Sequence, residues 1–245
     1  MIYANPAPSD SQLLTLYTRA GFVSARESIF AGQTYSKYLP AIVSRLPDLK
    51  GALDVGTGDG AFLEHLVRYG FSSITGIEPS ADSISKAKPA IRPLIKKGFF
   101  NPNDHGDEQY SLVSLFQTVE HLLCPMETTR AFFRILKKGG ALFIAGHNFK
   151  ALSSRLMRTR SPIFDVEHMQ LFSKKSLFKM MKEAGFSDIK VDPMMNTYPL
   201  NYYAQLVPLP QRIKAPLMAV LTKTGLSKIA IPAYIGNLAA IGYKR

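Results

Sequence analysis

The stretch Gly51-Ala-Leu-Asp-Val-Gly-Thr-Gly-Asp-Gly60 decides the fold of this chain. Leu53–Val55 reads as a short buried strand, three alternating glycines follow, and Ala61–Tyr69 then shows the apolar spacing of a helix. A strand that runs through a glycine loop into a helix lets the backbone approach a nucleotide-like ligand closely. The stretch therefore predicts a ligand site of this kind within an α/β domain.

Two acidic positions narrow the prediction. Asp54 lies two positions before the first glycine, and Glu78 lies 24 residues after Asp54, at the end of the next apolar run. A carboxylate at the end of the second strand of such a unit can grip the hydroxyl groups of a ribose. The sequence thus predicts a cofactor that contains a nucleoside.

Length and composition are those of one globular domain with additions. The chain has 245 residues, of which 46% are apolar and 20% charged. The single Cys124 excludes an intrachain disulfide framework and suits a reducing compartment, so we expect a cytoplasmic protein. We expect no secretory signal in the first residues, and the charge-free run Ile229–Tyr243, at 15 residues, is too short to span a membrane.

The net charge of +12 is unevenly distributed. Residues 1–50 carry 5 basic and 3 acidic side chains, residues 51–149 carry 10 of each, and residues 150–245 carry 15 basic and 5 acidic ones. A basic excess confined to the later part indicates an anionic partner there: a phosphorylated or carboxylated substrate, a membrane surface or nucleic acid. A solvated basic surface explains the excess equally well.

Apolar periodicity predicts strands and helices in alternation after a helical N-terminal part. Strands are expected at Leu53–Val55, Ser73–Ile77, Leu94–Phe100, Tyr110–Phe116, Ala141–Ala145, Ile189–Val191 and Leu238–Tyr243. Helices are expected at Ser11–Arg19, Tyr35–Leu46, Ala61–Tyr69, Pro79–Lys88, Met126–Leu136 and Ser173–Ala184. This alternation predicts a Rossmann-like, mostly parallel sheet with helices on both faces and ligands beyond the carboxyl ends of its strands.

The same pattern divides the single domain. The expected parts are an N-terminal helical lid (1–47), a cofactor-binding core (48–146), two substrate-side insertions (147–172 and 193–235) and a final strand (236–245). The segment Leu206–Ile231 mixes apolar residues with four basic ones. Such a composition suits a membrane interface or a helical cap over the active site, and we favour the cap.

The glycine loop also fits the dinucleotide fingerprint, but four features favour S-adenosylmethionine (SAM). Asp54 stands where a carboxylate meets a cationic amino group and would repel a pyrophosphate. The loop follows about 50 residues of helical material instead of opening the chain. The fourth strand runs into Phe116-Gln-Thr-Val-Glu-His-Leu122, and Leu136-Lys-Lys-Gly-Gly140 precedes the fifth.

With these motifs the chain resembles the class I SAM-dependent methyltransferases. It is most similar to the small-molecule branch that includes the ubiquinone-biosynthesis O-methyltransferases and sugar- and natural-product-modifying enzymes. The resemblance covers roughly residues 45–192 and the final strand, and includes His168-Met-Gln-Leu-Phe-Ser173 followed by Ala184-Gly-Phe186. It implies a seven-stranded sheet whose last strand runs antiparallel.

The resemblance also implies cofactor contacts. The glycine loop would hold the methionyl part of SAM with Asp54 near its amino group, Glu78 would bind the ribose hydroxyls, and Pro79 would line the adenine pocket. Phe99 stands where the family often has an acid, so adenine recognition would rest on backbone amides and stacking. The cofactor-binding residues expected are Asp54, Gly56, Thr57, Gly58, Gly60, Glu78, Pro79, Phe99, Phe100 and Gln117.

The candidate catalytic bases are His121, His147 and His168, because a histidine can take a hydroxyl proton near neutral pH. In the quinone O-methyltransferases, a segment like 116–122 with an additional acid is implicated in metal binding. Gln117 occupies that acid's place here, so we expect no metal.

On the substrate side, Arg155 and Arg158 would share a helix face and recognise an anionic acceptor if their segment is helical, and Tyr35 is a further candidate. An exposed basic loop is the alternative for the two arginines.

The leading hypothesis is SAM-dependent methylation of a small molecule, on oxygen, with an anionic or lipid- or sugar-linked acceptor. The alternatives are a nucleic-acid or protein methyltransferase and a catalytically silent SAM-binding subunit. The fourth strand does not end in the Asn/Asp-Pro-Pro-aromatic tetrapeptide of amino-methylating enzymes, and no interleaving of aromatic and basic residues suggests base stacking. We therefore expect no nucleic-acid partner, and the oligomeric state stays open.

Overall fold

The computed structural model describes residues 1–4, 25–158, 161, 163–164, 168–207 and 209–245. The strands are β1 (Ile2–Tyr3), β2 (Ala52–Val55), β3 (Ile74–Glu78), β4 (Ile95–Lys97), β5 (Tyr110–Phe116), β6 (Leu136–His147), β7 (Gln170–Leu171), β8 (Ser187–Pro199) and β9 (Ala230–Tyr243). The helices are α2 (Ala25–Ser36), α3 (Leu39–Val43), α4 (Ala61–Arg68), α5 (Ala81–Ser85), α6 (Pro125–Ile135), α7 (Leu152–Met157), α8 (Lys174–Glu183), α9 (Leu200–Leu206) and α10 (Gln211–Lys223).

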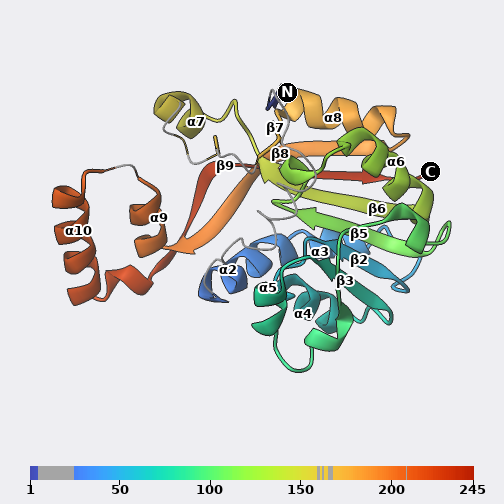
Figure 1. Cartoon of the computed structure of the whole chain (residues 1–245), viewed down its shortest axis with the longest axis horizontal. Helices are drawn as coiled ribbons and strands as arrows, with labels where there is room; N and C mark the ends of the chain where they lie inside the picture. The colour runs from blue at the N-terminus through green and yellow to red at the C-terminus, as the bar shows by residue number, and fades with distance from the viewer. Residues whose placement is uncertain (5–24, 159–160, 162, 165–167, 208) are drawn as a thin grey trace.

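Seven strands form one sheet in the order β4-β3-β2-β5-β6-β9-β8 (Figure 1). The pairs among β4, β3, β2, β5 and β6 are parallel, and β9 is antiparallel to both of its neighbours. The expected Rossmann-like sheet with an antiparallel last strand is confirmed. Because β2, β3 and β5 run the same way, the segments that follow them meet at one edge of the sheet, where ligands of such folds bind.

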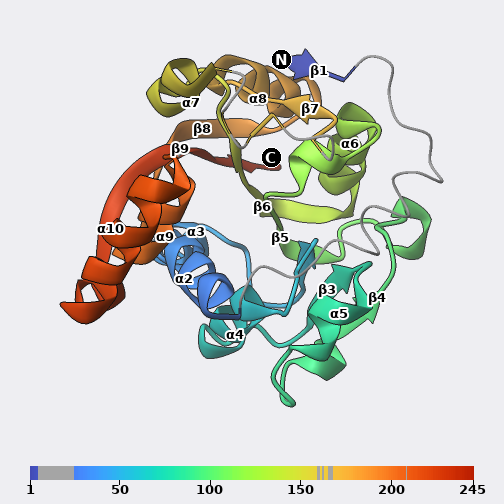
Figure 2. The ribbon, with the colours of Figure 1, turned by 60° about the vertical axis from the view of Figure 1, so that its left-hand side comes forward.

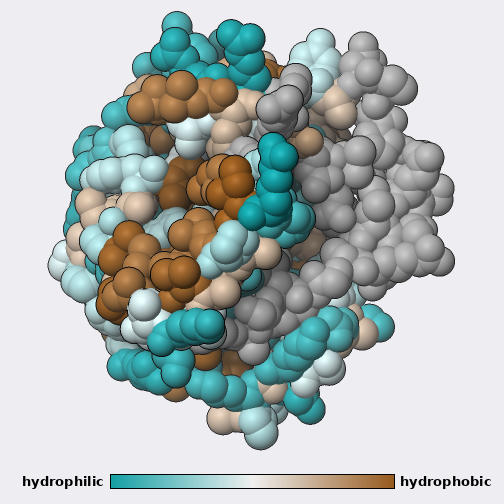
Figure 3. Space-filling view, turned by 90° about the vertical axis from the view of Figure 1, so that its left-hand side faces the viewer, coloured by the Kyte–Doolittle hydropathy of each residue, from teal (hydrophilic) through white to brown (hydrophobic). Residues whose placement is uncertain are grey.

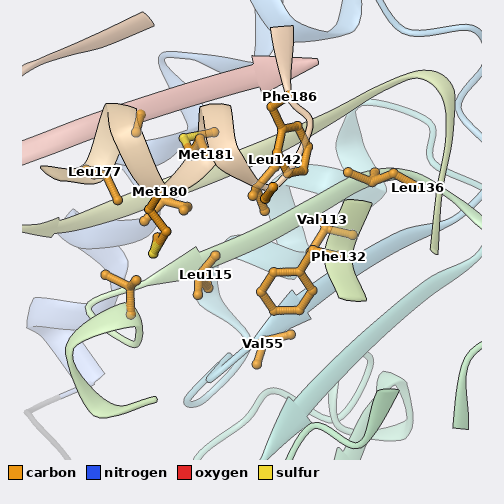
Figure 4. Close-up of a cluster of buried hydrophobic side chains, with 14 of the residues drawn as sticks. Val55, Val113, Leu115, Phe132, Leu136, Leu142, Leu177, Met180, Met181 and Phe186 are labelled. Atoms are coloured by element: carbon orange, nitrogen blue, oxygen red, sulfur yellow. The ribbon is translucent and has the colours of Figure 1, made fainter. Parts of the chain in front are cut away.

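Helices cover both faces of the sheet, each over its own apolar core. On one face, α6 and α8 contribute side chains such as Phe132 and Met181 to a cluster with the strand residues Val113 and Leu142 (Figure 4). On the other face, α2, α3 and α4 pack on a second cluster. Of these three, α4 was expected from its apolar spacing at Ala61–Tyr69, whereas α2 (Ala25–Ser36) was not expected from the sequence.

Helix boundaries follow local chemistry. The helix expected from Ser173 is α8, and Ser173 caps it through a capping box with Ser176. The helix expected at Tyr35–Leu46 is two helices instead, because α2 ends at Ser36 and α3 begins at Leu39, next to Pro40. Pro40 suits the first turn of a helix and cannot continue one that precedes it. The helix expected at Ser11–Arg19 lies outside the described residues.

The last two strands extend well beyond the sheet. They pair from Ser187 opposite Tyr243 to Pro199 opposite Ala230, and the outer part of this ribbon carries α9 and α10 at its end (Figures 1 and 2). We call residues 195–235 the arm. The interpretation of 193–235 as an insertion between two short strands is thus wrong in its boundaries.

Prolines explain that error. Pro193 and Pro232 read as strand breakers, yet both lie within strands. β8 is the edge of the sheet, and the outer ribbon has only two strands, so each strand there has one edge without a neighbour. Proline is tolerated at such edges because no ladder hydrogen bond is lost.

Within the described part of the chain, none of the helices has the length and apolar character needed to cross a membrane.

Candidate active site

The glycine loop between β2 and α4 is closely packed on both sides. Gly56, Gly58 and Gly60 have φ of 74°, 60° and 75°. A Cβ added at Gly56 would lie 2.2 Å from Oγ1 of Thr118, and one at Gly60 would lie 2.5 Å from Cγ2 of Ile91. Glycine is therefore required at both positions by conformation and by space.

Asp54 holds this loop in shape. Its carboxylate accepts hydrogen bonds from the hydroxyls of Thr57 (2.7 Å) and Ser114 (2.6 Å). Burial raises the pKa of Asp54 to about 6, although the two hydroxyls oppose the shift. The structure thus gives Asp54 two protein partners, and a place near the cofactor's amino group stays a prediction.

The raised pKa makes the contribution of Asp54 to stability depend on pH. The folded protein holds this proton more tightly than the unfolded chain does, so ionisation costs stability progressively as the pH rises from 3.8 to about 6. We expect Asp54→Asn to gain about 2 kcal/mol of unfolding free energy relative to the parent chain between about pH 4.5 and pH 7.5. Urea denaturation at both pH values measures this difference, and parallel pH profiles of the two proteins would contradict it.

Glu78 connects the end of β3 to the glycine loop. Its Oε2 accepts a hydrogen bond from the backbone N–H of Gly58 (2.8 Å), and its Oε1 accepts one from that of Ser80 (2.9 Å). Burial raises the pKa of Glu78, and these two N–H groups oppose the shift. Ser80 in turn caps α5, so Pro79 lies in a tight connection between the two. Each carboxylate oxygen keeps a second lone pair that can accept from a ribose hydroxyl.

The two aromatic candidates for the adenine pocket lie in different surroundings. Phe99 is half exposed after β4. Phe100 stacks on His105 with ring centroids 5.2 Å apart and also contacts Phe132 of the core. The structure therefore gives Phe100 a packing role beneath the sheet edge, and Phe99 remains the candidate for stacking on adenine.

Gln117 lies at the end of β5 in a strained conformation, with φ of 51°. Its backbone N–H donates to the carbonyl of Ala145 (2.8 Å), which fixes the turn. Its Oε1 is buried and has no hydrogen-bond partner among the described residues. A buried acceptor without a partner calls for a ligand or a water.

Tyr35 of α2 packs over the same end of β5. Its ring stacks on Phe116 with centroids 4.0 Å apart and meets Phe62 edge-on. Burial raises the pKa of the Tyr35 hydroxyl, and hydrogen bonding with Gln117 opposes that shift. Tyr35 is mostly a core residue, and only its hydroxyl lies beside the candidate site.

The three candidate histidines come together. The His168 ring lies 4.9 Å from that of His121 and 5.1 Å from that of His147, measured between centroids. They arrive from three places: the 3₁₀ turn after β5 (Val119–His121), the end of β6, and the segment before β7. No group of three or more His, Cys, Asp or Glu in the described residues could hold a metal ion.

Hydrogen bonds orient the rings of His168 and His147. Nδ1 of His168 lies 2.8 Å from the carbonyl oxygen of Ile163, and Nδ1 of His147 lies 3.0 Å from Oδ1 of Asn237. An oxygen of this kind only accepts, so each Nδ1 carries the proton and each neutral ring keeps a lone pair on Nε2. Burial lowers the pKa of His147, and the bond to Asn237 opposes the shift.

Glu120 lies fully buried behind the histidines. Its Oε1 accepts a hydrogen bond from the backbone N–H of His147, and its Oε2 has no partner among the described residues. Burial raises the pKa of Glu120, while the N–H of His147 and the charge of His168 oppose the shift.

The turn after β5 joins the two halves of the site. Thr118 lies against Gly56 of the glycine loop, and Glu120, two positions on, lies against Gly146 beside His147. The histidine cluster and the predicted cofactor loop therefore flank one short segment at the carboxyl edge of the sheet.

The two arginine candidates lie at the end of α7. Arg155 is exposed in the last turn of α7, and Arg158 follows that helix with φ of 50°. The helix ends at Met157, so the expected shared helix face is not formed. Neither guanidinium forms an ion pair with a residue that the structure describes.

Three residues that the sequence analysis did not single out contact the candidate site residues. Ser114 donates a hydrogen bond to Asp54, Thr118 packs against Gly56, and Asn237 accepts a hydrogen bond from His147. Ser114 and Asn237 are buried polar residues within otherwise apolar strands. Burying a polar group costs free energy unless it is hydrogen-bonded. A polar residue within an apolar strand therefore indicates a hydrogen-bonding role.

The residues at the glycine loop fit a nucleoside cofactor. The glycine backbone leaves a space that a Cβ would fill, and the carboxylate of Glu78 lies at the end of β3. Oε1 of Gln117 is buried and can accept a hydrogen bond from a ligand.

Comparison with known proteins points the same way. A family described as "Methyltransferase domain" matches residues 28–191. A ubiquinone biosynthesis O-methyltransferase of Aliivibrio fischeri is 22% identical over 169 residues, which cover 62% of this chain and 72% of that protein.

Solved structures share the fold. A SAM-dependent methyltransferase of Thermotoga maritima, described as a possible histamine N-methyltransferase, has a TM-score of 0.59 and 20% identity, covering 95% of this chain and 100% of that one. Phosphoethanolamine N-methyltransferase 2 of Haemonchus contortus, in complex with S-adenosylhomocysteine, has a TM-score of 0.53 and 14% identity, covering 91% of this chain and 60% of that one.

Proposed function

This chain belongs to the class I SAM-dependent methyltransferases, and we propose that it methylates an oxygen of a small, anionic acceptor. The observation that carries the proposal is the cluster of His121, His147 and His168 beside the glycine loop. A hydroxyl acceptor needs a base to remove its proton, whereas a neutral amine can attack before it loses one.

SAM, when bound, supplies a methyl group that its sulfonium already activates. We assign Gly56, Thr57, Gly58 and Gly60 to its methionyl part, Glu78 to its ribose, and Phe99 and Pro79 to its adenine. Ser28 supports a lid role for the N-terminal segment 1–47, because its hydroxyl donates to Asp59 of the loop (2.7 Å).

His168 is the best placed base. Nδ1 donates to the carbonyl of Ile163, which leaves the Nε2 lone pair to take the acceptor's proton. Asn237 and Glu120 hold the ring and backbone of His147, and we assign His147 to the wall of the acceptor pocket.

The acceptor class can be tested directly with SAM, the purified chain and paired compounds. S-adenosylhomocysteine release should be seen with a hydroxybenzoate, less with its neutral methyl ester, and least with the matching aminobenzoate. Turnover confined to amines, or to protein or RNA, would overturn the proposal. Steeply salt-dependent RNA or DNA binding would favour the nucleic-acid alternative.

The anionic preference rests on Arg155 and Arg158. We expect the double change Arg155→Gln and Arg158→Gln to raise KM for the charged acceptor roughly tenfold, because each solvent-exposed charge pair contributes at most about 1 kcal/mol. The matched control is Lys179→Gln with Lys182→Gln, which removes the same charge from α8. Equal KM values for the two double variants would leave the arginines without a substrate role.

The compartment belongs to the same proposal. The only cysteine, Cys124, is an exposed free thiol, which favours the cytoplasm as the place of reaction.

A further inference from the structure

We propose that the arm and α7 form a surface that docks on an anionic lipid bilayer. This inference goes beyond methyl transfer: the arm and α7 carry none of the candidate catalytic histidines, and Arg155 of α7 is the one candidate substrate residue on them. The face turned to the viewer in Figure 3 shows several apolar clusters among polar side chains, on the side of the molecule where α7 and α10 project in Figures 1 and 2.

The apolar part of this surface has helical order. In α10, Ile213, Leu217 and Val220 recur at spacings that place them on one stripe, and they are 49%, 38% and 56% exposed. Met218 and Leu221, on the flank that also carries Lys214, are half-buried. A helix that leaves such an apolar stripe exposed has an unpartnered face.

α7 adds a second pair of apolar side chains. Leu152 and Leu156, one helical turn apart, are 70% and 74% exposed. We call the stripe of α10 and this pair the apolar face.

The charged residues around the apolar face indicate which kind of partner binds it. No aspartate or glutamate occurs from residue 193 to the end of the sequence, whereas Arg212, Lys214, Lys223 and Lys228 lie in or beside α10. On a helical wheel Arg212 and Lys223 fall on one flank of the exposed stripe and Lys214 on the other. Apolar residues flanked by cations, without acids, match the boundary between acyl chains and anionic headgroups.

The length of the arm suits this role. α9 and α10 stand at the end of a two-stranded ribbon, so apolar side chains can enter a headgroup layer without the sheet having to approach it. No helix in the described residues is long and apolar enough to span a membrane, so contact would be interfacial.

Co-sedimentation with vesicles tests the proposal on the whole chain without SAM. We expect binding to vesicles of equal parts phosphatidylglycerol and phosphatidylcholine, little binding to phosphatidylcholine alone, and weakening by salt. The change Arg212→Gln, Lys223→Gln and Lys228→Gln should lower partition roughly 100-fold, because each basic residue near such a surface contributes about fivefold. The control Lys175→Gln, Lys179→Gln and Lys182→Gln on α8 removes the same charge and should lower partition far less.

The apolar face has its own variants. Leu217→Asp with Val220→Asp should abolish vesicle binding, whereas Val67→Asp, at an exposed apolar position of α4, should not. Calorimetric SAM binding by every variant checks that the fold is intact. The proposal is overturned if the parent chain ignores phosphatidylglycerol vesicles, or if the α10 and control variants bind alike. It is also overturned if light scattering shows a dimer that Leu217→Asp dissociates, because a second copy then covers the face.

Discussion

His168→Ala is expected to lower kcat roughly 10²- to 10⁴-fold, the range that a positioned general base supplies. The affinity for SAM should change little, because His168 contacts the other two histidines and Ile163 rather than the glycine loop. Single-turnover kinetics with saturating SAM, combined with calorimetry for the cofactor, separate the two effects.

Two comparisons make this prediction specific. Added imidazole should restore part of the activity of His168→Ala if the lost group is a base, and a purely structural defect would not respond. His65→Ala, which removes a histidine of α4, should leave kcat unchanged. If His168→Ala keeps full kcat while His147→Ala or His121→Ala loses it, the base is one of those residues, and the assignment is wrong.

Glu78→Ala is expected to raise the Kd for SAM roughly 100-fold or more. The change removes the carboxylate that would bind the ribose, and it also leaves the N–H groups of Gly58 and Ser80 without their acceptor. A hydrogen bond to a charged group contributes about 1.5–3 kcal/mol, so the loss of two bonds from the Glu78 carboxylate to the ribose hydroxyls accounts for this change in Kd. Isothermal titration with SAM measures it.

The conservative and remote variants define the outcome. Glu78→Gln keeps one acceptor oxygen and should fall between alanine and the parent chain, whereas Glu64→Ala, at an acid of α4, should bind SAM normally. NADH should bind none of these proteins appreciably. A Kd for SAM that is unaffected by Glu78→Ala, or more affected by His168→Ala, would place the ribose elsewhere.

The central sheet could be predicted because its strands are short, largely apolar runs. Tyr110–Phe116 is predicted to the residue, since every position of β5 is buried and only two small polar residues, Ser111 and Ser114, lie among its apolar ones. The strands with weaker signals have different bounds. β4 is a three-residue edge strand where seven residues were expected, and β6 starts at Leu136, through a bulged stretch that contains Gly139.

The site could be predicted only in part, because the sequence identifies candidate residues but does not show which of them the fold brings close together. His121 and His147 were expected at the carboxyl edge since they follow β5 and β6, which are neighbours. That His168 lies between them depends on β7, a two-residue strand pairing with β1, and no periodicity reveals so short an element. The helical pairing of Arg155 with Arg158 fails for a similar reason, because α7 ends between them.

The strands that carry the arm also contact the candidate active site through Asn237. The arm therefore cannot be deleted without an effect on that site. Asn237 of β9 orients His147 and donates through Nδ2 to Oδ1 of Asn196 on β8 (3.2 Å). A shortened protein without residues 195–235 would lose Asn196, and with it the brace of the Asn237 amide. Deleting the arm therefore disturbs the tautomer of His147. Loss of activity in such a truncated variant would not show whether the arm binds lipids.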